Sequence, residues 1–175
     1  MLDIFKKKTA PAFEVALRIG AIFAGVELHD EVADVLRAYS EALGIAYQIR
    51  DDLADLGQTQ DTSDISGLRP SLLLATAFER AKDADKLALE SHWRRLSTAT
   101  PAEIESLYLA LGADDRCRDL LERYKEEAIR TLRDVENANL KGLLRRVLGK
   151  IFNDTEIKGW CKEFEEKNLA GAAAM

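Results

Sequence analysis

The chain has 175 residues, of which 47% are hydrophobic and 32% are charged, and its formal net charge is −6. This length fits one domain or a piece of a larger one. The hydrophobic fraction is sufficient for a sizeable core, which disfavours an intrinsically disordered protein. The negative net charge argues against a general nucleic-acid binder, because such proteins present basic surfaces.

The cysteines and the hydropathy pattern indicate the compartment. Cys117 and Cys161 lie far apart with no CxxC pair, which favours free thiols in a reducing environment over a zinc site or a disulfide framework. The first residues lack the long apolar segment of a secretory signal. No apolar run approaches the roughly 20 residues that a membrane-spanning helix needs. We therefore expect a cytoplasmic protein without a transmembrane segment.

Helical periodicity runs along nearly the whole sequence, which contains three prolines and no alternation typical of β-hairpins. This pattern predicts an all-α fold in a single domain over residues 1–169, with a flexible tail at 170–175. The predicted helices cover about 9–26, 31–56, 69–81, 84–96, 101–111, 114–152 and 154–168.

Two of these helices carry specific expectations. Apolar residues almost encircle helix 9–26, so we expect it to be largely buried. Helix 114–152 is unusually long and contains two candidate points at which it could bend or break, Asn137–Asn139 and Gly142.

The most informative stretch runs from Gln48 to Asp55. On a helix, its amide and its three carboxylates fall within an arc of roughly 100°. These residues are Gln48, Asp51, Asp52 and Asp55. Converging carboxylates repel one another and are costly to bury unpaired, whereas a hard cation such as Mg²⁺ binds carboxylate oxygens and bridges to phosphate. A solvated acidic helix face is the alternative interpretation, and the flanking sequence decides between them.

The position of this motif within its helix also points to function. The motif lies in the last two turns of helix 31–56, where the partial negative charge of the helix end disfavours carboxylates. A stretch that violates a local rule is a candidate functional site, because a bound cation could compensate the repulsion. The polar, glycine-bounded segment 57–68 follows and is expected to form a surface loop beside the motif.

Three segments of the chain match the pattern of one family in the same order and at about the same spacing. They are Lys8-Thr9 at the start of the first predicted helix, LGIAYQIRDDLAD at residues 43–55, and the proline-led apolar helix from Arg69. Together they resemble the C-terminal half of a trans-isoprenyl (polyprenyl) diphosphate synthase, with its Lys-Thr pair and its second aspartate-rich motif. The resemblance implies an all-α helical bundle of the isoprenoid synthase type, of which this chain is an incomplete, C-terminal portion.

The resemblance also implies a metal and diphosphate site. Asp51 and Asp52 would be the main Mg²⁺ ligands, with Asp55 in the same cluster. Lys8 would hold the allylic diphosphate. Before the proline-led helix the family usually offers a Gly-Lys pair, and here that lysine contact is lost or Arg69 replaces it.

The implied reaction is prenyl transfer, with Thr9 and Gln48 lining the site near the carbon where the allylic cation develops. Mg²⁺ and Lys8 would neutralise the diphosphate as it leaves an allylic prenyl diphosphate. Isopentenyl diphosphate would then extend the prenyl chain by one unit. The family's first aspartate-rich motif and its isopentenyl diphosphate contacts are not found in this sequence, so the other half of the active site would be missing or supplied by another chain.

Two functions therefore remain open. The first is a polyprenyl diphosphate synthase-like transferase of isoprenoid biosynthesis that works with another polypeptide. The second is a non-catalytic helical subunit that acts in assembly, regulation or prenyl-chain binding. A half-bundle would expose apolar helix faces in either case, so we expect a homo- or hetero-oligomer.

Overall fold

The computed structural model of the chain describes residues 1–57, 65, 69–133 and 135–154. Its elements are α1 (Leu2–Lys8), α2 (Ala10–Phe23), α3 (Asp30–Ala54), α4 (Leu72–Arg80), α5 (Asp83–Trp93), α6 (Pro101–Ala110), α7 (Ala113–Thr131) and α8 (Ala138–Phe152). These residues include no strand, so the described part of the chain is all-α. The predicted helix 154–168, after its first residue, and the tail 170–175 lie outside the described residues.

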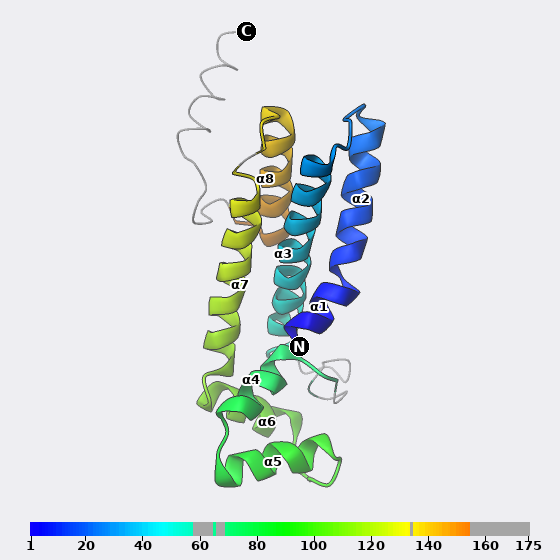
Figure 1. Ribbon diagram of the computed structural model, residues 1–175. Helices are drawn as coiled ribbons and strands as arrows, with labels where there is room; N and C mark the ends of the chain where they lie inside the picture. The colour runs from blue at the N-terminus through cyan, green and yellow to red at the C-terminus, as the bar shows by residue number, and fades with distance from the viewer. Residues whose placement is uncertain (58–64, 66–68, 134, 155–175) are drawn as a thin grey trace.

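Helix α3 forms the axis of the molecule (Figure 1). It has 25 residues and is therefore roughly 37 Å long. Helices α1 and α2 run along one side of α3, and α7 and α8 lie on the other side. Helices α4, α5 and α6 gather below the C-terminal end of α3, which is the end that carries the acidic motif.

Two apolar clusters pack along α3. One cluster joins α3 to α2, α7 and α8 and contains Leu36, Tyr39 and Leu43, all fully buried. The other joins the C-terminal part of α3, including Ile49, to α1 and to helices α4 to α7. The Tyr39 hydroxyl donates a hydrogen bond to the carbonyl oxygen of Leu144 at 2.7 Å, which ties α8 to α3. Because α3 contributes to both clusters, it determines where the other helices lie.

A short helix that the sequence did not predict precedes α2. The chain forms α1 over Leu2–Lys8, and Thr9 separates it from α2 with φ −108° and ψ −39°. Ala10 then packs directly on α3, because a Cβ added at Gly44 would lie only 2.8 Å from the Cα and N atoms of Ala10. The close approach of the two helices therefore depends on the absence of a side chain at position 44.

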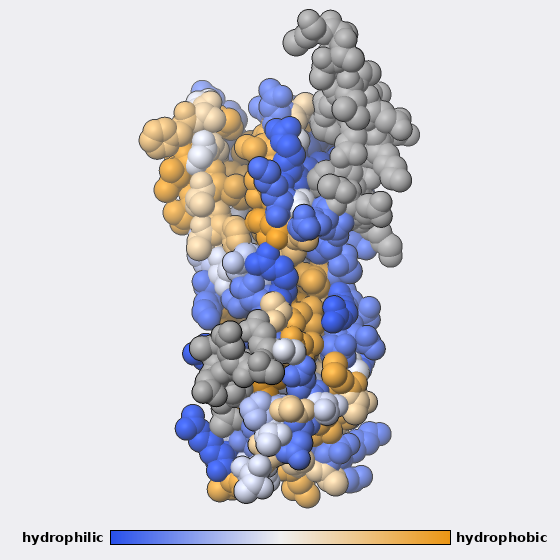
Figure 2. Space-filling view, turned by 180° about the vertical axis from the view of Figure 1, so that it is seen from behind, coloured by the Kyte–Doolittle hydropathy of each residue, from blue (hydrophilic) through white to orange (hydrophobic). Residues whose placement is uncertain are grey.

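The expectation that helix 9–26 is largely buried is wrong. Only Ala10 and Ala21 of α2 are buried, and large apolar side chains on its outward side are exposed. They are Val15 (56%), Ile19 (52%), Ile22 (61%) and Phe23 (89%), which we call the α2 apolar face. Figure 2 shows hydrophobic surface gathered over α2, at the upper left of the view. An apolar pattern that encircles a helix predicts burial only if every side has a neighbour, and no segment among the described residues covers this one.

The helix predicted over 114–152 is two helices. Helix α7 ends at Thr131, with Leu132 as its C-cap. The Asn137 side chain then caps α8 by accepting a hydrogen bond from the N–H of Leu140 at 3.0 Å. Asparagine favours such caps because its side chain competes with the backbone for hydrogen bonds. The break allows α8 to turn back along α7 and α3 (Figure 1).

Candidate active site

The acidic motif occupies the last turns of α3, and its three carboxylates do not share one environment. Asp51 and Asp55 are partly exposed, whereas Asp52 is only 3% exposed. Asp51 and Asp55 are four residues apart and therefore lie one above the other on the same side of the helix. The motif thus presents a pair of accessible carboxylates and one buried carboxylate.

Asp52 points toward the start of α4. Its Oδ2 accepts a hydrogen bond from the backbone N–H of Leu72 at 2.5 Å. Leu72 is the first residue of α4, so its N–H has no partner within the helix, and the positive end of the helix dipole favours a carboxylate there. Ser71 completes the cap, because its Oγ accepts a hydrogen bond from the N–H of Leu74 at 3.2 Å.

Arg50 joins Asp51 to the C-terminal end of α8, a role that the sequence did not reveal. Its guanidinium pairs with the Asp51 carboxylate at 2.9 Å and donates to the carbonyl oxygen of Ile151 at 2.6 Å. The guanidinium also lies over the rings of Tyr47 and Phe152, 4.4 Å and 5.8 Å from their centroids. The contact with Ile151 spans 101 positions of sequence, so helical periodicity contains no signal for it.

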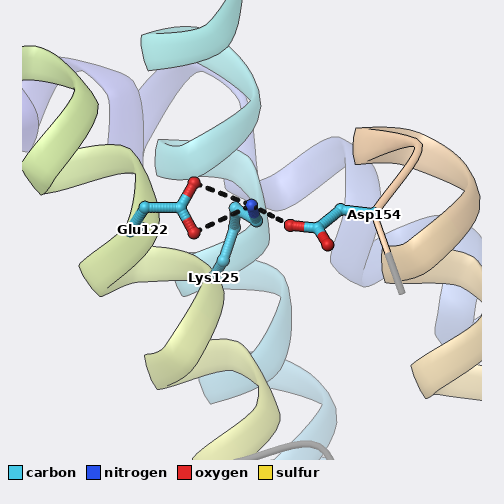
Figure 3. Close-up of polar contacts among 3 residues, drawn as sticks. All are labelled: Glu122, Lys125 and Asp154. Atoms are coloured by element: carbon cyan, nitrogen blue, oxygen red, sulfur yellow. Dashed lines mark hydrogen bonds and ion pairs between the residues drawn. The ribbon is translucent and has the colours of Figure 1, made fainter. Parts of the chain in front are cut away.

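A second charged cluster holds the end of α8 from the side of α7 (Figure 3). The side chain of Lys125 is 5% exposed, and its Nζ lies 2.8 Å and 3.0 Å from the Glu122 carboxylate oxygens and 2.5 Å from Oδ2 of Asp154. Burial disfavours the charged amine, but hydrogen bonds with Asp154 and Glu122 outweigh it and raise the pKa of Lys125 above its usual value. Only the Glu122–Lys125 spacing was visible in the sequence, and it did not single out this cluster.

The Lys-Thr pair meets the acidic helix through one hydrogen bond. The Thr9 Oγ1 donates to the Oε1 of Gln48 at 3.0 Å, across 39 positions of sequence. Thr9 lies at the junction of α1 and α2, and Gln48 precedes Asp51 by about one helical turn. The structure therefore brings together two site residues that were predicted from separate segments.

Lys8 differs from the lysines beside it. Lys6 pairs with Glu41 at 2.6 Å and Lys7 pairs with Asp3 at 2.9 Å. Lys8 is exposed and has no acidic partner within the described part of the chain. Its charge is therefore available to an anionic ligand, whereas the other two lysines serve local ion pairs.

Arg69 is exposed and lies two residues before Ser71, the N-cap of α4. The contact between Asp52 and Leu72 holds this end of α4 against α3. Arg69 therefore stands close in the chain to the point where the acidic helix and α4 meet.

The donor set fits Mg²⁺ only in combination with a ligand. Among the described residues, no group of three His, Cys, Asp or Glu side chains is placed to hold a metal ion. Asp51 and Asp55 offer two carboxylates on one side of α3, while Asp52 is directed to Leu72 instead. Mg²⁺ is usually bound through one or two carboxylates together with waters and substrate phosphates. A phosphate-bearing molecule would thus complete the coordination.

Comparison with known proteins identifies the family. The polyprenyl synthetase family matches residues 1–111, which is more than half of the chain. The chain belongs to the polyprenyl synthetase family. The matched region includes helices α1 to α6 and every candidate site residue from Lys8 to Arg69.

Several curated proteins resemble this polyprenyl synthetase chain. Geranylgeranyl diphosphate synthase of Methanosarcina mazei is 28% identical over 152 residues, which cover 83% of this chain and 45% of the relative. Short chain isoprenyl diphosphate synthase of Methanothermobacter thermautotrophicus is 31% identical over 96 residues, which cover 51% of this chain and 29% of the relative. The chain spans about half the length of the curated geranylgeranyl diphosphate synthases that it matches.

Solved structures share the polyprenyl synthetase fold at lower identity. A geranylgeranyl pyrophosphate synthase superposes with a TM-score of 0.73 at 20% identity, covering 89% of this chain and 51% of that structure. A decaprenyl diphosphate synthase from Rhodobacter capsulatus superposes with a TM-score of 0.75 at 22% identity, covering 87% of this chain and 49% of that structure. The shared fold therefore extends beyond residue 111 toward α7 and α8.

In the described residues, no helix is both long and apolar enough to cross a membrane.

Proposed function

We propose that this chain forms part of the active site of a prenyltransferase of isoprenoid biosynthesis, which condenses an allylic prenyl diphosphate with isopentenyl diphosphate. Membership in the polyprenyl synthetase family supports this proposal. The observation that carries it is the hydrogen bond from Thr9 to Gln48. This bond connects the Lys-Thr pair to the helix that bears the accessible carboxylates of Asp51 and Asp55, so the residues needed for diphosphate and cation lie on connected elements.

Asp51 and Asp55 would bind Mg²⁺, and Lys8 and Arg69 would bind the diphosphate. Ionisation of an allylic diphosphate places additional negative charge on the leaving group, and Mg²⁺ supplies the charge that stabilises it. The exposed charge of Lys8 would add to that stabilisation. Arg50 restrains the Asp51 carboxylate through an ion pair, because its own guanidinium is held by a hydrogen bond to the carbonyl oxygen of Ile151.

Thr9 and Gln48 would line the site next to the carbon on which positive charge develops. Their side-chain oxygens carry partial negative charge, and their mutual hydrogen bond restricts the rotamers of both. Dipoles that are fixed before the reaction stabilise a developing charge without reorganisation. The leaving diphosphate can accept the proton that is lost after condensation, so no catalytic histidine is required.

The rest of the active site would come from residues that this chain does not contain. The chain spans about half the length of its curated relatives, and the α2 apolar face is uncovered within the described residues. Large exposed apolar patches are typical of interaction sites. We infer that a second polypeptide or a second copy of this chain packs on this face and contributes the remaining substrate contacts.

The second candidate is a non-catalytic helical subunit that acts in assembly, regulation or prenyl-chain binding. The half-length of the chain relative to its curated relatives favours it. Such a subunit would keep the fold and bind a diphosphate weakly or not at all. It would show no condensation activity even when mixed with a partner that supplies the missing half.

Calorimetric titration with methylene bisphosphonate, with and without Mg²⁺, tests the proposal. We expect Mg²⁺-dependent binding that is lost when Asp51 and Asp55 are both replaced by alanine. The matched control replaces Glu31 and Asp34, which lie on the first turns of the same helix, so the same number of charges is removed far from the site. Binding that is absent, independent of Mg²⁺, or equally weakened by the control would contradict the metal site.

An elongation assay with labelled isopentenyl diphosphate separates the two candidate functions. A prenyltransferase part should convert an allylic diphosphate when its partner is present, and the Asp51→Ala and Asp55→Ala variant should abolish that conversion. A chain that binds bisphosphonate but supports no conversion with any partner that packs on it would instead be the non-catalytic subunit.

A further inference from the structure

The two adjacent aspartates of the motif have different neighbours, although their sequence positions suggest one shared role. Asp51 is partly exposed and pairs with Arg50 at 2.9 Å. Asp52 is 3% exposed, and its Oδ2 lies 2.5 Å from the backbone nitrogen of Leu72. A buried carboxylate that accepts a backbone hydrogen bond at a helix start already has a structural partner, whereas a partly exposed carboxylate can exchange its partner for a ligand.

We propose that Asp52 is a positioning residue that fastens the end of α3 to the start of α4, and that it does not bind the metal. The statement about the metal rests on the proposed function, because it divides the acidic motif into ligands and an anchor. Asp51 and Asp55 are the ligand pair in this division. The fastening itself follows from the contact with Leu72 alone.

The anchor is suited to its position for two physical reasons. The N–H of Leu72 opens α4, so it has no acceptor within the helix and depends on a group from outside. The negative charge of Asp52 also lies at the positive end of the α4 dipole. Ser71 serves the N–H of Leu74, so the two side chains satisfy different donors of the same helix start.

The residues around the start of α4 are densely packed, which makes the connection between α3 and α4 rigid. Leu72 and Leu73 are 5% and 1% exposed, and Thr76 one turn later contacts Cys117 of α7 at 3.8 Å. The residues between Gly57 and Arg69 connect α3 to α4 through the chain, but Asp52 connects them directly. This contact therefore holds the C-terminal end of α3, which carries Asp51 and Asp55, against the start of α4, which Arg69 precedes.

Three substitutions separate an anchor from a ligand. Asp52→Asn keeps a carbonyl oxygen that can accept the Leu72 N–H but removes the charge that a metal needs. Asp52→Ala removes both. Asp51→Asn is the matched control, because it makes the same chemical change at the neighbouring position. All three are made in the full chain, and circular dichroism verifies that each variant is folded.

Hydrogen exchange at the Leu72 amide tests the anchor. We expect exchange in Asp52→Ala to be at least about tenfold faster than in the wild-type chain, because the amide loses its acceptor. Asp52→Asn should retain protection to within about threefold, since the acceptor remains. Unchanged protection in Asp52→Ala would overturn the fastening. If Asp52→Ala does not fold, the exchange rate of the Leu72 amide in Asp52→Asn decides. The fastening proposal requires only an acceptor at position 52, so faster exchange at Leu72 in Asp52→Asn would overturn it.

Mg²⁺-dependent binding of methylene bisphosphonate tests the division of the motif. We expect Asp51→Asn to weaken this binding by about tenfold or more, and Asp52→Asn to weaken it by less than about threefold. Equal losses in the two variants would show that Asp52 is a ligand and overturn the proposal. A wild-type chain without any Mg²⁺-dependent binding would sink the proposed function and with it the division of the motif, while the exchange at Leu72 would still decide the fastening.

Discussion

Helices α3 and α2 run side by side, yet this chain covers them to very different extents. Helix α3 is packed by α1, α2, α4 and α7 and buries Leu36, Tyr39 and Leu43 completely. Helix α2 has equally apolar residues, but its outward side exposes Ile19 to 52% and Phe23 to 89%. Apolar area stabilises a fold only where it is removed from water. The difference means that one side of this helix pair is packed into the core, while the outward side of α2 leaves apolar side chains exposed.

The largest expected effect tests the packed side directly. Leu43→Ala should lower the free energy of unfolding by about 2–5 kcal/mol, because it leaves a cavity in a fully buried site. Ile19→Ala on α2 is the matched control and should change it by less than about 0.5 kcal/mol. Urea denaturation followed by circular dichroism measures both. Similar losses in the two variants would mean that the outward side of α2 is covered in solution.

A second pair of variants compares two helical glycines. A Cβ at Gly44 would lie 2.8 Å from backbone atoms of Ala10, whereas a Cβ at Gly20 meets nothing within 4 Å. Gly44→Ala should therefore destabilise the protein by about 1–3 kcal/mol, because α2 must move away from α3. Gly20→Ala should stabilise it by about 0.5–1 kcal/mol through helix propensity. Thermal unfolding of both variants distinguishes these opposite signs, and a stable Gly44→Ala variant would contradict the tight α2–α3 contact.

The pH dependence of the free energy of unfolding tests the burial of Cys117, which lies on α7 in the packed core. Burial raises the pKa of the Cys117 thiol from an ordinary 9.0 to about 11, although a hydrogen bond with Thr76 opposes the shift. The unfolded thiol ionises first as pH rises, so the folded state loses stability between about pH 9 and 11, and about 1 kcal/mol is lost at pH 10.

Denaturation of the wild-type chain and of Cys117→Ala at pH 8 and pH 10 isolates this contribution from other groups that titrate there. The loss on going to pH 10 should be smaller in the variant by that amount. An identical loss in both proteins would mean that the thiol is accessible in the folded state.

The smallest effect on stability, and the largest on association, is expected at the α2 apolar face. Replacing Ile22 and Phe23 by serine should change the free energy of unfolding by less than about 0.5 kcal/mol, since both side chains are exposed. It should reduce self-association or partner binding, measured by sedimentation velocity. Leu87→Ser on α5 is the control, because Leu87 is 65% exposed but lies outside this face. Association that survives the double substitution would assign the interface to another surface.

Much of the fold was predictable, because helical periodicity is a local property. The expected helices at 31–56, 69–81 and 101–111 lie close to the bounds of α3, α4 and α6. The short helix α1 was not assigned from the pattern, whereas Asn137–Asn139, where the chain breaks between α7 and α8, was one of the two candidate break points in helix 114–152. The start of α8 is local, because Asn137 caps it three residues along the chain. The start of α2 lies at a tertiary contact, because Ala10 packs against Gly44 of α3.

The candidate site was only partly predictable. Motif spacing found Thr9 and Gln48, which the structure places in contact. The same reasoning grouped Asp52 with Asp51 and Asp55, because helical geometry places neighbouring residues on one broad arc and does not say what faces that arc. Residues that support the site from neighbouring helices cannot be recognised by a periodic pattern in the sequence. Lys125, for example, pairs not only with Glu122 on its own helix but also with Asp154, which lies 29 positions away.

The sequence by itself determined the helical class, the family resemblance and the stretch of α3 that carries the candidate site. These features depend on residue types at short, regular spacings, which can be recognised in the sequence without any knowledge of the fold. Only the tertiary structure decided that Asp52 faces Leu72, that Arg50 links Asp51 to Ile151, and that no described segment covers the α2 apolar face. Each of these depends on which segments pack together, and the first two contacts join residues 20 and 101 positions apart.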